Sequence, residues 1–242
     1  MTIRMWAATA ACVVLSTPDS AAAADYFLKS REATNDVYLY VGSGWFHDGS
    51  QDTDFFVAPL EARTLTASDW EFSARTQFFD GSVGGQSDSA VGDLTLSAAK
   101  NFRHLGKLDF LSLEVGQVLS HAPASFSNDT DAYFKLRMQA GETLAQVEFN
   151  LIVAEVDKKL AGYGDVRSTA ALGLRSWLGQ HHIGADFVAT NRHGMSQAGS
   201  VDLVYMYQFW NGNAFYVMLE KGLSDAYGGF YGGLGFEWAV GF

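Results

Sequence analysis

Cysteine is almost absent from this chain. The only one, Cys12, lies in the first 24 residues, so the rest of the molecule has no disulfide or thiolate chemistry available to it. Proline is scarce too, with three in 242 residues, while hydrophobic residues make up 48% of the composition. A chain this long and this apolar does not belong to the disordered class, and we expect a single folded domain.

A long hydrophobic run is also missing. No stretch reaches the ~18 uninterrupted apolar residues of a membrane-spanning helix. The apolar stretch Met5–Leu15 follows one basic residue and is followed by a polar break and a small-residue motif that ends at Ala24. This order is typical of a secretory signal, so we predict a signal peptide over 1–24 and a mature domain over 25–242. A lipid anchor at Cys12 fits less well, because the apolar stretch continues past it.

Basic residues are outnumbered, with 16 Lys and Arg against 27 Asp and Glu, and the formal net charge is −11. We find no basic cluster along the chain, which argues against nucleic acid as a partner and against docking on anionic lipid surfaces. The glycines from Gly228 to Gly235 are not followed by a helix, so they form no phosphate cradle. We expect no cofactor.

The sequence is rich in alternation of apolar and polar residues at a period of two. In the segment DWEFSARTQFF, Trp70, Phe72 and Phe78 fall on one side. Glu71 and Arg75 fall on the other. The same pattern recurs through the mature chain, whereas stretches with a helical period are hard to find. We therefore predict strands nearly throughout.

The connections between these strands alternate in length. The long ones are rich in Gly, Ser and Asp, as in DGSVGGQSDSA and SHAPASFSNDT, and the short ones are tight turns such as TASD, GE and GQH. A chain that alternates in this way forms an up-and-down antiparallel meander. Both of its ends lie at the short-turn side when the strand count is even.

Three features indicate that the apolar side of the strands meets lipid. Most strands match the ~9–11 residues that a tilted strand needs to cross a bilayer. Aromatic residues such as Trp70 and Phe78 stand near the two ends of the apolar side. Ions such as Arg75 and Glu148 stand mid-strand on the other side, which suits a wet lumen. The predicted fold is all-β, a transmembrane antiparallel up-and-down β-barrel of about 12 strands.

The chain ends in GGFYGGLGFEWAVGF, with Phe236, Trp238, Val240 and Phe242 at alternate positions. In this it resembles the outer-membrane β-barrels of Gram-negative bacteria, which typically end in a strand with a terminal aromatic residue. The resemblance implies that these four residues are an assembly signal for the barrel-assembly machinery, and that the exported protein is surrounded by outer-membrane lipid. The last strand must also pair with the first, since an open edge in lipid leaves backbone groups without hydrogen bonds.

Two segments carry a narrower resemblance. VGDLTLSAAKNF and GLSDAYGGFYGGLGFEWAVGF are similar to parts of the outer-membrane family named after the meta-pathway of phenol degradation. Members of that family are regarded as transporter-like, so this resemblance implies transport. It covers short stretches only, while the general resemblance covers the whole mature chain.

Side chains on the polar register are expected to line the lumen. Both signs of charge occur among them, which predicts weak selectivity between cations and anions. A hairpin centred on Ala67 would place Arg63 opposite Glu71. A turn at GE would place Lys135 opposite Glu148. The predicted channel-lining residues are Glu61, Arg63, Glu71, Arg75, Asp93, Glu114, Tyr133, Lys135, Arg137, Glu148, Arg167, Arg175, Asp186, Asp202, Tyr216 and Glu220.

This lining predicts a channel or porin for the passive diffusion or uptake of small polar or aromatic solutes, without catalysis. Close pairing of the same charges leaves open a structural barrel with an occluded lumen. A further alternative is a lipid-modifying barrel enzyme of the phospholipase or lipid A deacylase kind, which places a His-x-Ser pair on its outer wall. None of the six histidines has a serine two residues later, and the nearest arrangement is His193 with Ser196.

Other polar clusters have simpler interpretations. The stretch from Asp48 to Asp54 offers oxygens at alternate positions, yet it lacks the glutamate and glycine placement of an EF-hand, so we expect a solvated outer loop. His181 and His182 are assigned to a tight turn and would project in different directions, so no metal pair is expected. Residues 25–33 could plug the lumen or hang free in the periplasm.

Overall fold

The structure is a computed structural model that describes residues 37–48, 53–83, 86–119, 130–142, 145–156, 166–192, 198–209, 214–223 and 230–241. The predicted signal peptide, the segment 25–33 and Phe242 lie outside the described residues. In the described ranges no helix is long and apolar enough to cross a membrane. The strands there are β1 Val37–Asp48, β2 Thr53–Leu65, β3 Trp70–Val83, β4 Gln86–Val91, β5 Leu94–Leu105, β6 Leu108–Leu119, β7 Thr130–Glu142, β8 Ala145–Val156, β9 Val166–Leu178, β10 His181–Arg192, β11 Ala198–Gln208, β12 Ala214–Gly222 and β13 Phe230–Gly241.

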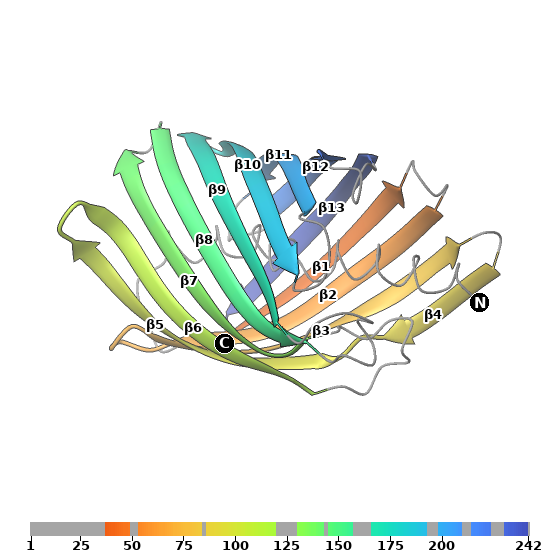
Figure 1. Ribbon diagram of the computed structural model, residues 1–242, viewed down its shortest axis with the longest axis horizontal. Coiled ribbons are helices and arrows are strands. Elements are labelled where there is room, and N and C mark those ends of the chain that lie inside the picture. Colours follow the sequence, from red (N-terminus) through yellow and green to blue (C-terminus); the bar gives the residue numbers. More distant parts are fainter. Residues whose placement is uncertain are drawn as a thin grey trace.

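The strands form one antiparallel sheet that curves round an interior (Figure 1). β1 pairs with β13 and with β2, and β2 pairs in turn with β3. Together with the pairings from β3 through β5 to β13, these ladders give twelve strands a neighbour on each side. β4 is the exception, because among the described residues it pairs with β3 alone. The prediction of an up-and-down β-barrel, with its last strand paired to its first, is confirmed.

β4 and β5 are two parts of one strand that is interrupted at Gly92. β3 pairs with both, so that Phe78 faces Val91 in β4 and Arg75 faces Thr95 in β5. Three steps along β3 thus correspond to four steps along its partner, which is the extra residue of a β-bulge. The amide of Gly92 still donates a hydrogen bond of 2.7 Å to a β3 carbonyl. The sheet therefore has thirteen strands, of which twelve form the ring.

Burial is the reverse of that in a soluble barrel. In the described part of the chain, nineteen polar or charged residues are buried against eleven hydrophobic ones. Large hydrophobic side chains such as Phe72, Leu172 and Phe187 are 47–52% exposed. A soluble protein packs such side chains into its core and seldom exposes them in a continuous patch. The apolar side of the strands is therefore the outer wall, as the alternation predicts.

The connections alternate in length only in part. FHDGSQDT was expected to be a long loop, but the connection after β1 spans 49–52, four residues as in the turn after β2. The connections after β10 and β11 are five residues each. Short turns follow β2, β5, β7 and β9, and all of them lie at one end of the sheet. The segment DGSVGGQSDSA was expected to be a long loop, but most of it extends the hairpin of β3 and β4, in which Asp80 faces Ser89. This segment has small polar residues at both odd and even positions. It therefore lacks the alternation of apolar and polar residues by which a strand is recognised in the sequence.

The register predicted between β2 and β3 is wrong by two residues. The turn that joins these strands holds Asp69 in the left-handed conformation, with a φ of 59°, and its centre lies one residue beyond Ala67. In a hairpin, two facing residues lie at equal distances in sequence from the centre of the turn. When the centre moves by one residue, the residue that faces a given position on the other strand therefore changes by two. Arg63 therefore faces Ser73, not Glu71.

The register predicted between β7 and β8 is wrong as well. The GE sequence was expected to turn, yet Gly141 and Glu142 both belong to β7. Gly141 adopts a φ of 116° inside the strand, a conformation that glycine reaches without strain. Lys135 consequently faces Ile152 and not Glu148.

The outward orientation of the apolar wall can be tested at Leu172, midway along β9. Replacing Leu172 by Arg is expected to cost about 2–4 kcal/mol of unfolding free energy in lipid vesicles, because the charge must sit at the middle of the bilayer. Leu178 ends the same strand and is equally exposed. Its replacement by Arg should cost no more than about 1 kcal/mol. Denaturant titrations of both variants give the comparison, and equal small losses would mean that the wall faces water.

Candidate channel lining

The residues predicted to line the lumen share the buried face of the sheet. Glu71, Arg75, Glu114 and Tyr133 are half-buried there. Tyr216 has the same register, opposite Met206, although its side chain lies outside the described residues. The other eleven are 4–7% exposed, and they are Glu61, Arg63, Asp93, Lys135, Arg137, Glu148, Arg167, Arg175, Asp186, Asp202 and Glu220.

Arg63 in β2 lies between two carboxylates. Its Nη2 is 2.7 Å from Oε1 of Glu61 on the same strand, and its Nη1 is 3.4 Å from Oε1 of Glu71 in β3. Asn101 donates a hydrogen bond of 3.3 Å to the other oxygen of Glu71. The predicted partnership of Arg63 with Glu71 thus forms diagonally across the hairpin. Charge-assisted hydrogen bonds of this kind are short and strong, so they hold the side chains against the wall.

The hairpin of β7 and β8 carries a second ion pair. Nε of Arg137 donates to Oε1 of Glu148 at 2.9 Å, and Asn150 donates to the same oxygen at 3.0 Å. The guanidinium of Arg137 also lies over the ring of Phe110, 5.6 Å from its centroid. The corrected register therefore gives Glu148 an arginine partner in place of the expected Lys135.

Arg175 in β9 and Asp186 in β10 form a bidentate pair. Nη2 donates to Oδ2 at 2.8 Å, and Nη1 is 2.6 Å from Oδ1. The planar guanidinium can lie along the sheet because two neighbouring positions lack side chains. A Cβ atom at Gly173 would stand 2.4 Å from Oδ1 of Asp186, and one at Gly184 would stand 3.1 Å from Cδ of Arg175. Without side chains at Gly173 and Gly184, the pair of Arg175 and Asp186 can lie flat against the inner face of the sheet.

Tyr133 in β7 lies over a glycine in the same way. It faces Gly116 directly across β6 and β7, and a Cβ atom at Gly116 would stand 2.2 Å from the ring. The hydroxyl of Tyr133 donates to Oε1 of Glu114 at 2.6 Å. An aromatic ring that covers a glycine on the next strand stabilises that pairing and occupies wall space instead of the interior.

Charge is unevenly distributed round the inner face. Asp186 faces Asp202 across β10 and β11, and Asp202 faces Glu220 across β11 and β12. Arg175 balances the first of these, and Ser200 donates to Oδ1 of Asp202 at 3.0 Å. The predicted basic lining residues come from β2, β3, β7 and β9. The inner face therefore has local ion pairs together with a more acidic sector.

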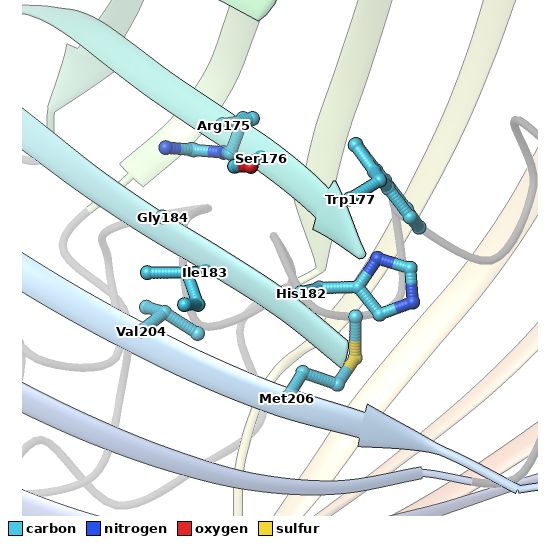
Figure 2. A pocket seen from close by; sticks show the side chains of 8 residues that line it. All are labelled: Arg175, Ser176, Trp177, His182, Ile183, Gly184, Val204 and Met206. Atoms are coloured by element: carbon cyan, nitrogen blue, oxygen red, sulfur yellow. The ribbon is translucent and has the colours of Figure 1, made fainter. Parts of the chain in front are cut away.

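Sequence reasoning missed an aromatic and amide cluster near the short-turn end. The turn before β10 ends at Gln180, so His182 belongs to the strand and is 5% exposed, whereas the histidine before it points to the exposed face. Figure 2 shows its ring between Trp177 and Met206 beside a small pocket, and the centroids of His182 and Trp177 are 3.6 Å apart. Nε1 of Trp177 donates to Gln146 at 3.0 Å. Continuing the alternation to the end of each strand would have found this cluster.

The remaining candidate residues lie wholly or partly outside the described part of the chain. His193 and Ser196 lie outside the described residues, as does most of the acidic stretch after Asp48. Phe236, Trp238 and Val240 belong to β13, whose backbone pairs with β12 and β1 while those side chains are not described. Within the described ranges, no group of three or more His, Cys, Asp or Glu could hold a metal ion.

The fold is shared with outer-membrane proteins of known structure. The KdgM porin is 11% identical with a TM-score of 0.56, and the match covers 82% of this chain and 98% of that one. The COG4313 outer membrane channel from Pseudomonas putida F1 is 14% identical with a TM-score of 0.58, covering 85% of this chain and 94% of the other. The β domain of the Bordetella autotransporter BrkA is 13% identical with a TM-score of 0.51, covering 85% and 99%.

These identities are too low to carry more than the fold. The resemblance to Gram-negative outer-membrane β-barrels is confirmed at that level. No family model matches the chain, and no curated protein matches it either. The narrower resemblance to the phenol-degradation family stays a prediction.

The close contact of Tyr133 with Gly116 can be tested by adding a methyl group. Gly116→Ala should lose about 1–3 kcal/mol of unfolding free energy, because the ring has to leave its place on the wall. Gly199→Ala is a matched control, since a Cβ atom there makes only an ordinary contact of 3.5 Å. It should change stability by less than about 1 kcal/mol. Guanidinium titrations in vesicles measure both, and a Gly116 variant as stable as wild type would contradict the contact.

Proposed function

We propose that this chain is an outer-membrane channel through which small polar or aromatic solutes diffuse passively. The observation that carries the proposal is the reversed burial, in which an apolar outer wall surrounds a lining of ions and amides. Stability alone does not favour such a lining, because well-packed hydrophobic residues can often replace buried ion pairs without loss. A water-filled passage for polar solutes requires a polar lining, which accounts for these residues on the inner face.

The dimensions of the barrel suit small solutes. Twelve strands form the ring. At a spacing of ~4.8 Å and a tilt of ~40°, they give a backbone cylinder about 24 Å across. Inward side chains narrow this to about 10 Å, which admits a sugar or a single aromatic ring.

The arrangement of the lining side chains supports a passage between them. The pair of Arg175 with Asp186 and the ring of Tyr133 lie along the wall, where glycines leave room for them. Ion pairs that are neutral over a few ångströms present little net field to a passing ion. We therefore assign the channel a weak preference between cations and anions, tilted towards cations by the acidic sector on β10–β12.

The location follows from the same reasoning. The predicted signal peptide over 1–24 directs export, and the outer membrane is the compartment in which barrels of this kind fold. In that membrane the short turns face the periplasm and the longer loops face outward. The KdgM porin and the COG4313 channel are channels by name, which supports the proposal by analogy of fold.

An occluded structural barrel is the second candidate. The observation in its favour is that eleven of the lining ions are only 4–7% exposed. A lipid-modifying enzyme has less support, because no histidine in the sequence has a serine two positions later. The autotransporter domain among the similar structures also has this fold, so the fold by itself does not separate these candidates.

Planar bilayer recordings test the channel. The purified barrel should give stepwise conductance with weak ion selectivity. Glu148→Gln removes the negative partner of Arg137, so the reversal potential should shift in the direction of greater anion permeability. Arg137→Gln removes the positive partner, so the reversal potential should shift in the direction of greater cation permeability. A correctly folded barrel that remains silent would favour the occluded candidate. An unchanged reversal potential in both variants would show that neither residue lines the conducting path.

A further inference from the structure

Lys100 stands on the outward-facing, apolar side of β5. Its neighbours across the ladders are Trp70 in β3 and Leu113 in β6, which are 44% and 38% exposed. A lysine is costly on a lipid-facing wall unless its ammonium extends to the polar interface. The ammonium of Lys100 does this, because it donates a hydrogen bond to the carbonyl of Ser68 in the turn between β2 and β3.

Two aromatic rings frame this ammonium. Nζ of Lys100 is 5.6 Å from the centroid of Trp70 and 5.8 Å from that of Phe102. Phe72 stacks beside Trp70, with centroids 6.3 Å apart and planes inclined by 14°. Tryptophan on a membrane protein settles at the level of the lipid headgroups. The charge and the rings therefore lie together where acyl chains meet headgroups.

The hairpin of β5 and β6 adds positive charge at the same end of the barrel. The sequence KNFRHLGK, residues 100–107, contains two lysines, an arginine and a histidine and no acidic residue. Arg103, His104 and Lys107 are all exposed, and Asp69 balances Arg103 at 3.2 Å. In a chain with a net charge of −11, this segment is a local basic cluster, which corrects the expectation that the chain has none.

We infer that Lys100, Trp70 and Phe102 form a binding site for the phosphate headgroup of an anionic phospholipid in the periplasmic leaflet. Ser68 uses one N–H group of the ammonium, and the other two are available to a phosphate oxygen. The acyl chains of the lipid lie over the exposed Phe72. The assignment to the periplasmic leaflet rests on the orientation proposed above, with short turns in the periplasm.

Charge complementarity determines which lipid is favoured. A zwitterionic headgroup carries its own cation, which repels Lys100 and Lys107, whereas an anionic headgroup does not. One lysine near an anionic membrane surface corresponds to a preference of about fivefold. The predicted site is therefore selective for the headgroup and tolerant of the acyl chain.

Native mass spectrometry of the full barrel tests the site. The protein is released from detergent that contains equal amounts of phosphatidylglycerol and phosphatidylcholine, and the retained lipids are counted. Wild type should retain phosphatidylglycerol about fivefold more often, and Lys100→Gln should lose this preference. Lys100→Arg should keep it. Lys221→Gln is the matched control, because Lys221 is an exposed lysine near the opposite end of the barrel, in β12.

A second measurement uses quenching of tryptophan fluorescence in vesicles. Brominated phosphatidylglycerol should quench wild type more than brominated phosphatidylcholine does, and Trp70→Phe should remove the difference. Equal retention and equal quenching by the two lipids would overturn the inference. So would a preference that survives in Lys100→Gln, or binding of soluble cell-wall fragments by Lys100 in place of lipid.

The inference and the proposed channel fail separately. Lys100 points away from the lining, so Lys100→Gln should conduct as wild type does. Lipid selectivity in a silent barrel would reject the channel and keep the lipid site. Conductance without lipid selectivity would do the reverse.

Discussion

Inside a bilayer every backbone amide and carbonyl has to find its partner within the protein, and this constraint governs the molecule. It explains why β1 and β13, which are furthest apart in sequence, pair along almost their whole length. It also explains why the bulge at Gly92 keeps a hydrogen bond to β3 where the ladder is disturbed. β4 continues the β5 strand beyond this bulge, outside the twelve-strand ring, and four of its six residues, Gln86 to Ser89, are polar.

A ring of paired strands fixes two environments, and the side chains divide between them. Hydrophobic residues occupy the outer face, and residues that would be too costly in lipid occupy the inner one. The inner residues then stabilise one another by short contacts, as Arg137 does with Glu148 and Arg175 with Asp186. Glycines on adjacent strands decide how far these groups stand from the wall. The shape of the interior is thus set as much by missing side chains as by charged ones.

The sequence predicts which face of the sheet each residue occupies, because the alternation of side chains is a property of each strand alone. The residue that each one faces on the neighbouring strand was predicted less well, because the register of a hairpin depends on the position of its turn. A single left-handed residue, Asp69, moved the hairpin centre and replaced Glu71 by Ser73 opposite Arg63. Gly141 looked like a turn and proved to be a strand residue. His182 was missed for a related reason, since its strand begins closer to the turn than the apolar pattern suggests.

The ion pairs have one property that concerns how the barrel is made. Arg63 with Glu71, Arg137 with Glu148 and Arg175 with Asp186 each join two strands that are linked by a short turn. Each of these hairpins therefore holds both members of its ion pair before any other strand arrives. During insertion the two charges of such a pair can enter the hydrocarbon layer together, so neither has to wait there for a distant strand.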